Sequence, residues 1–222
     1  RSPNPYTNTY IAIAAFYLAM LDGIKACVTS GKDLKALEAE ISKEAGVEGF
    51  YLEKDRQYRT EEDVFEDFTA EERDHLFGKP PATVWENMCA FEAYPEKLAV
   101  LTGSGILKKE YAESFKQGAL IRWQTELLTR IIPENYQVVI DCKRLHSQDF
   151  STDLDLALWN KIQNLRTKLA KDSFDTASIF TCIRKAIAEG DYDTASEKQV
   201  EMAEIMLKLK KLYNQYKQNI ID

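Results

Sequence analysis

Hydrophobic residues recur along most of the chain at intervals of three and four, the spacing that gathers side chains on one face of a helix. The pattern predicts helices at about 33–45, 69–77, 84–91, 106–132, 152–171, 175–189 and 193–219, with Pro133 ending the longest of them. Val138–Ile140 is a short β-favouring run that is either a strand or the tail of a helix. The chain is therefore predicted to be all-α, a multi-helix bundle.

The segment from Tyr10 to Leu21 differs from these amphipathic helices. It carries no charged residue, and its alanines and large apolar side chains are distributed all round the helix. A helix of this kind is typical of burial against other structure, and the segment is too short to cross a bilayer, which takes about 20 residues. Asn8 and Thr9 offer side-chain oxygens to cap its start. A buried helix this early predicts that the chain begins within a longer protein.

Capping residues mark several of the predicted helix ends. Thr69 and Glu72 have the spacing of a capping box, in which each side chain accepts from the other residue's backbone N–H. Asp175 and Asp193 each follow an aromatic residue and precede Thr-Ala-Ser, so both are predicted N-caps, with Gly190 ending the helix between them. The last two helices are then expected to form an antiparallel hairpin.

The composition is that of a folded protein that is neither disordered nor embedded in a membrane, with 45% hydrophobic and 29% charged residues. Its four cysteines, at positions 27, 89, 142 and 182, lie far apart. This spacing indicates reduced, buried thiols in a cytoplasmic protein rather than a zinc site or a disulfide framework. Neither His75 nor His146 is followed three or four residues later by a second His or Cys, so no metal ligand is predicted in this chain.

The net charge of −7 is concentrated in one stretch. Residues 48–92 contain thirteen Asp and Glu against five Lys and Arg, a local balance of −8, while the rest of the chain is close to neutral. The acidic stretch lacks calcium-loop spacing and is interpreted as a solvated surface. There is no basic stripe with interleaved aromatic residues, so nucleic acid is not a predicted partner.

The start of the chain resembles a motif near the end of the catalytic domain of bacterial type I glutamine synthetases. In one ungapped run it carries the family's residues Arg1, Ser2, Pro5, Asn8, Tyr10, Ala12, Ala19, Leu21, Asp22, Gly23 and Ile24. It departs from the family at Asn4, Thr9 and Met20, where the family has Asp, Pro and Gly.

The resemblance continues less specifically through the middle of the chain. Asp55–Tyr58, Glu71–Arg73 and Pro81–Asn87 are similar to short family elements that precede a last long helix, here placed at 107–132. The family's chain ends shortly after that helix, whereas this one continues. The predicted organisation is therefore a helical C-terminal part of the catalytic domain at 1–145 and a helical extension at 146–222.

The resemblance implies that the full-length parent is a glutamate–ammonia ligase. Such an enzyme uses ATP and Mg or Mn ions to make γ-glutamyl phosphate from glutamate, and ammonia then attacks it to give glutamine. Arg1 occupies the position of an arginine that binds glutamate and the phosphorylated intermediate, a task suited to a guanidinium. No other site residue is implied, and no cofactor-binding residue is expected in this chain. The implied partners are the rest of the synthetase chain and further copies of it in a cytoplasmic homo-oligomer, without membrane or nucleic acid.

Two functional readings remain open from the sequence. In the first, the chain is the C-terminal part of the synthetase and is inactive alone, because the ammonia site, the nucleotide site and most metal ligands precede Arg1. In the second, it is a helical interaction or assembly module without catalytic activity, the segment 146–222 being the appended bundle that makes the contact.

Overall fold

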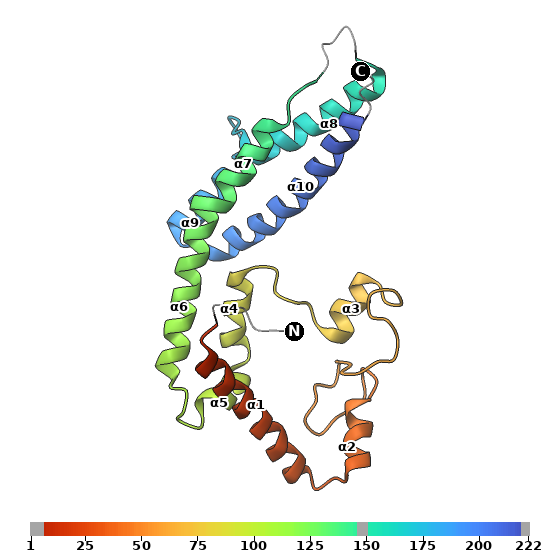
Figure 1. Cartoon of the computed structure of the whole chain (residues 1–222), viewed down its shortest axis with the longest axis vertical. Helices are drawn as coiled ribbons and strands as arrows, with labels where there is room; N and C mark the ends of the chain where they lie inside the picture. The colour runs from red at the N-terminus through yellow and green to blue at the C-terminus, as the bar shows by residue number, and fades with distance from the viewer. Residues whose placement is uncertain (1–6, 146–150, 219–222) are drawn as a thin grey trace. The chain divides into compact units, whose positions relative to one another are not determined.

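The computed structural model describes residues 7–145 and 151–218, and every regular element within these ranges is a helix (Figure 1). The all-α prediction is therefore confirmed. The elements are α1 (Thr9–Ser30), α2 (Leu34–Ile41), α3 (Ala70–Phe77), α4 (Val84–Ala93), α5 (Pro95–Thr102), α6 (Lys109–Glu126), the π-helix η1 (Leu127–Ile131), α7 (Ile132–Asp141), α8 (Asp153–Ala170), α9 (Ile179–Glu189) and α10 (Tyr192–Gln218).

The chain divides into two compact units. Unit 1 comprises Arg1–Pro81 and Phe91–Glu113, and unit 2 comprises Ala82–Ala90 and Ser114–Asp222. Helices α4 and α6 each pass from one unit into the other. The predicted boundary after residue 145 falls inside unit 2, where α8 packs against α7. The boundary is placed where the chain of the similar family ends. It stays a prediction about the origin of residues 146–222.

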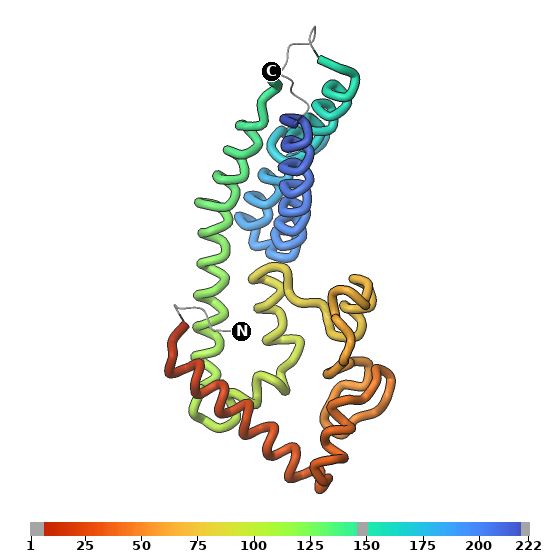
Figure 2. The backbone as a smooth tube through the Cα atoms, turned by 45° about the vertical axis from the view of Figure 1, so that its right-hand side comes forward, coloured from red at the N-terminus to blue at the C-terminus, as the bar shows by residue number. Residues whose placement is uncertain are grey.

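Unit 2 is a bundle of three rods. The part of α6 that belongs to this unit, η1 and α7 form one continuous rod, α8 followed by α9 forms the second, and α10 packs along both α8 and α9 (Figures 1 and 2). Trp159 near the start of α8 contacts Tyr216 near the end of α10, with ring centroids 5.5 Å apart. Gly190, in the left-handed conformation, turns the chain between α9 and α10 and confirms the predicted antiparallel hairpin.

The interior of unit 2 is one apolar cluster to which all three rods contribute. Its fully buried members include Leu127, Ile132, Ile162, Leu169, Ile183 and Leu209. Burying side chains of this size contributes about 1.5–3 kcal/mol each before the entropic cost of ordering them. The regularly spaced apolar residues of the sequence therefore form the buried interior that stabilises the bundle.

Three local predictions in unit 2 are wrong. Pro133 does not end the helix, which continues through α7 to Asp141 after the wider turn η1. A proline inside a helix has no backbone N–H to donate, and its ring clashes with the carbonyl of the preceding turn. The wider π-turn directly before Pro133 relieves this clash. Val138–Ile140 is consequently the tail of a helix. Asp175 is not the N-cap of α9, because Ser178 accepts from the Thr181 N–H and begins the helix three residues later. Asp193 is not the N-cap of α10 either, because the helix begins at Tyr192 and the Thr194 N–H donates to Asp191 at 3.1 Å.

The prediction that residues 10–21 are buried is also wrong. Helix α1 belongs to unit 1 and has 22 residues, of which only Leu18 is buried among those described. Most of its large apolar side chains are exposed: Tyr10, Ile11, Ile13, Phe16, Tyr17, Met20, Leu21, Ile24 and Val28. By length and composition alone the helix could cross a membrane, a test that core helices of soluble proteins also pass, so the expectation that the segment is too short does not hold.

Candidate functional site

Arg1, the one residue assigned a catalytic-site role by resemblance, lies outside the described residues, as does His146. The role of Arg1 in binding glutamate and phosphate therefore stays a prediction. The residues of the resemblance that the structure describes begin at Asn8 and lie on α1, on the segment between α2 and α3, on α3 itself, and at the start of α4.

Asn8 starts α1 in the way the sequence predicts. Its side-chain oxygen accepts from the backbone N–H groups of Tyr10 and Ile11, at 3.1 and 3.2 Å. Such a cap satisfies donors that the first turn of a helix otherwise leaves unpaired and is worth about 1 kcal/mol. Gly31, with φ at 63°, ends the helix in the left-handed conformation. The motif's asparagine is thus a helix cap in this chain.

Asp22, another motif residue, is joined to the segment that follows α2. Its carboxylate accepts a hydrogen bond from the Tyr51 hydroxyl, which raises the pKa of Tyr51 because ionisation would place two negative charges together. Nearby, Gly23 and residues of α2 line an apolar cavity of about 160 Å³. Asp22 therefore anchors the loop after α2 through its hydrogen bond with Tyr51.

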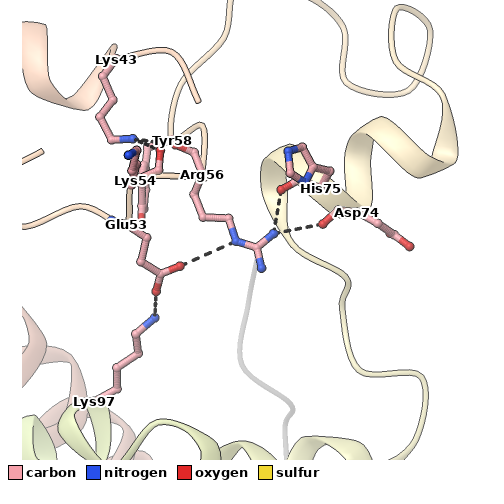
Figure 3. Close-up of polar contacts among 8 residues, drawn as sticks. All are labelled: Lys43, Glu53, Lys54, Arg56, Tyr58, Asp74, His75 and Lys97. Atoms are coloured by element: carbon pink, nitrogen blue, oxygen red, sulfur yellow. Dashed lines mark hydrogen bonds and ion pairs between the residues drawn. The ribbon is translucent and has the colours of Figure 1, made fainter. Parts of the chain in front are cut away.

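Lys43 organises the loop that carries Asp55–Tyr58 (Figure 3). It is 7% exposed, and its ammonium donates to the carbonyl oxygens of Lys54 at 2.9 Å and Arg56 at 3.0 Å while facing the Tyr58 ring. A buried ammonium is stable only when its donors are satisfied, and here two carbonyls and an aromatic face do this. Lys43 is thus committed to holding the loop.

Arg56 extends the same network to the end of α3 (Figure 3). Its guanidinium donates to the carbonyl oxygens of Asp74 at 3.0 Å and His75 at 2.9 Å, which are unpaired acceptors of a helix end. Glu53 lies 3.7 Å from Arg56 and 2.7 Å from the Lys97 ammonium. The hydrogen bond from Lys97 lowers the pKa of Glu53, and the same bond raises the pKa of Lys97.

The third element of the resemblance, Pro81–Asn87, lies at the start of α4. Thr83 is 7% exposed, accepts from the Glu86 N–H at 3.2 Å, and meets the Ser196 hydroxyl at 2.5 Å. Trp85 donates its indole N–H to Asp193 at 2.7 Å. These residues fix α4 to α10 within unit 2, which is a packing role.

The structure thus joins Asp22 to the α2–α3 segment and ties Arg56 to the end of α3, and it places Thr83 in the other unit. The sequence gives no local signal for Lys43 as an anchor, because its acceptors follow eleven and thirteen positions later. Among the residues that the structure describes, no three His, Cys, Asp or Glu side chains are arranged to hold a metal ion. The network of Lys43, Arg56, Glu53 and Lys97 therefore holds the α2–α3 segment in place. Its charged groups bind backbone oxygens and one another.

Comparisons with protein-family models, with curated proteins and with solved structures found no match to this chain.

Proposed function

We propose that the chain is the C-terminal part of a bacterial glutamine synthetase, a cytoplasmic, homo-oligomeric ligase that joins ammonia to glutamate through γ-glutamyl phosphate. The ungapped run from Arg1 to Ile24 carries the proposal, since it aligns polar, proline and glycine positions as well as apolar ones. Three of its residues, Asn8, Asp22 and Gly23, occupy defined places at the ends of α1 or in its contact with the following loop.

The exposure of α1 supports the same proposal. A helix that is apolar on every side leaves a large hydrophobic surface in water, and surfaces of this kind mark places where other structure packs. In the proposed parent, the part of the catalytic domain ahead of Arg1 would cover this helix. Arg1 would then stand at the junction, where its guanidinium could hold the carboxylate or phosphate of the substrate.

The ATP and the Mg or Mn ions of the proposed enzyme would be held mainly by residues outside this chain. Among the described residues, Lys43 and Arg56 bind backbone carbonyls and Glu53 pairs with Lys97. No three His, Cys, Asp or Glu side chains of the described residues are arranged to hold a metal ion. In the proposed enzyme most of the metal ligands precede Arg1. The 222-residue chain alone is therefore expected to be inactive.

The test compares the 222-residue chain with a longer protein that also contains the residues encoded directly upstream of Arg1. We expect ATP-dependent γ-glutamyl hydroxamate formation, requiring Mg or Mn, only from the longer protein. In that protein Arg1→Ala should lower activity by at least about tenfold, the equivalent of 1.4 kcal/mol, whereas Arg184→Ala, at an exposed position on α9, should not. Turnover by the 222 residues alone, or a longer protein without ligase activity, would refute the proposal.

A second candidate function is an assembly module, favoured by the self-contained core of unit 2. Deleting 146–222 does not test it cleanly, because α8, α9 and α10 supply most of the cluster that buries Ile132 and Val139. Surface substitutions that leave this core intact are the sharper test. In the longer protein they should change oligomer size or partner binding while ligase kinetics stay constant, and unchanged assembly and binding would argue against this function.

A further inference from the structure

A groove of about 560 Å³ runs between α8 and α10 on the surface of unit 2. Lys161 lines it from α8, and Lys208 and Lys211 line it from α10. At Asn164 it meets a second groove of about 620 Å³, which reaches Lys171 just past the end of α8. The ten residue steps from Lys161 to Lys171 correspond to about 15 Å of helix, or about three turns.

The three lysines of the first groove lack a counter-charge within the described residues. None of them lies within ion-pair distance of a carboxylate there, whereas Lys168 and Lys198 of the second groove share Glu201 at 2.6 and 2.8 Å. Lys208 and Lys211 are three positions apart on one helix, an arrangement in which like charges repel. The nearest acidic residue along α10 is Glu204, one turn before Lys208 and outside the lining.

The base of the first groove is apolar. Leu165 of α8 and Leu212 of α10 line it and pack against the buried cluster of unit 2. The lysines are exposed, so their ammonium groups remain in water along the rim. A ligand that matches this surface carries apolar groups along its centre and negative charges at its edges.

We infer that this groove docks an acidic amphipathic helix from another protein. Two packed helices leave a surface furrow into which a third helix can lay its apolar face, with two or three residues spaced by three and four as anchors. Leu165 and Leu212 receive the apolar stripe, and the unpaired lysines meet glutamates or aspartates beside it. A phosphate backbone would satisfy the lysines and leave the leucines unused, so nucleic acid fits less well. The inference is independent of the ligase proposal, because it concerns binding alone.

The test uses the full chain and a labelled helical peptide of about 14 residues, four turns long, with leucines along one face and glutamates on both sides of them. Fluorescence anisotropy should show binding that weakens with salt. Replacing the glutamates by glutamine, or the leucines by serine, should each reduce affinity by about tenfold or more. A single-stranded oligonucleotide of equal charge should compete poorly.

Matched variants locate the binding on the molecule. K161Q/K208Q/K211Q should weaken peptide binding by about tenfold or more, and R184Q/K185Q/K210Q, with the same change of net charge outside this groove, should leave it within about twofold. Circular dichroism melts of both variants establish that each is folded. The inference is overturned if the peptide does not bind, if both variants lose affinity equally, if the serine peptide binds as well, or if the oligonucleotide displaces it.

Discussion

The hydroxyl oxygens of Thr83 and Ser196 lie 2.5 Å apart in the interior of unit 2, although 113 positions separate them in the chain. Both residues are almost completely buried, and Thr83 also accepts from the Glu86 N–H at the first turn of α4. This pair joins the loop before α4 to the start of α10. The coupling between these two hydroxyls therefore tests whether α4 packs against α10 in unit 2.

Removing either hydroxyl leaves the other buried with one partner fewer. Thr83→Ala and Ser196→Ala should each lower the free energy of unfolding by about 1–3 kcal/mol, and the double variant should cost clearly less than their sum. Urea denaturation of the four proteins measures this coupling. Ser114→Ala, at an exposed position of α6, is the control and should change stability by less than about 0.5 kcal/mol. Strictly additive losses would show that the two hydroxyls do not interact.

Ile183 is fully buried in the cluster shared by the three rods of unit 2. Ile183→Ala should destabilise the protein by about 2–5 kcal/mol, because it removes apolar contact and leaves a cavity. Ile121→Ala makes the same chemical change at a residue that is 64% exposed and should cost less than about 0.5 kcal/mol. Denaturant midpoints of the two variants compare them, and similar losses would contradict the described core.

Lys43→Met keeps most of the side chain's length and removes the ammonium that holds the Lys54 and Arg56 carbonyls. The loop should open more often, at a cost of about 1–3 kcal/mol for the loss of two hydrogen bonds from a charged donor. Hydrogen exchange of the Gly46 amide, which donates to Lys54 O at 2.9 Å, should become faster. Lys35→Met at an exposed position of α2 is the control. Unchanged exchange in Lys43→Met would mean that the ammonium does not secure the loop.

The cysteines should react in an order set by burial. Cys142 is 3% exposed, and burial raises its pKa, so both access and thiolate fraction are low. Cys27 on α1 is exposed and should be alkylated first, while Cys142 should react only as the protein unfolds. Timed alkylation followed by mass spectrometry gives the order. Rapid modification of Cys142 in the folded protein would contradict this packing.

The Glu53–Lys97 pair predicts a pH dependence of unit 1. Because the folded-state pKa of Glu53 is below its ordinary value of 4.5, the pair's contribution is complete above that value and is lost as pH falls through the lowered pKa. The raised pKa of Lys97 keeps the contribution until pH rises past 10.5. Both side chains are substantially exposed, so the effect is about 0.5 kcal/mol. Glu53→Gln should remove it at pH 7 and have little effect near pH 3; equal effects at both would contradict it.

Much of the local structure could be read from the chain. The capping box at Thr69 and Glu72, the Asn8 cap and the turn at Gly190 depend on contacts within a few residues, which sequence patterns report directly. Asp175 was mistaken for a cap because Ser178, three residues on, offers the same chemistry. The Asp172 carboxylate accepts from its N–H at 2.7 Å and favours the later start.

The sequence by itself determined most of the helical segments, although not α5 or the continuation through α7, because the spacing of apolar side chains and the capping residues are properties of neighbours along the chain. Only the tertiary structure decided what each helix face meets. It left α1 exposed, although a helix that is apolar all round predicts burial, since burial depends on what is available to cover it. It also brought Lys161, Lys208 and Lys211 to one groove and Thr83 to Ser196. These contacts arise because helices far apart in the sequence pack together, and patterns among neighbouring residues do not show which helices will pack.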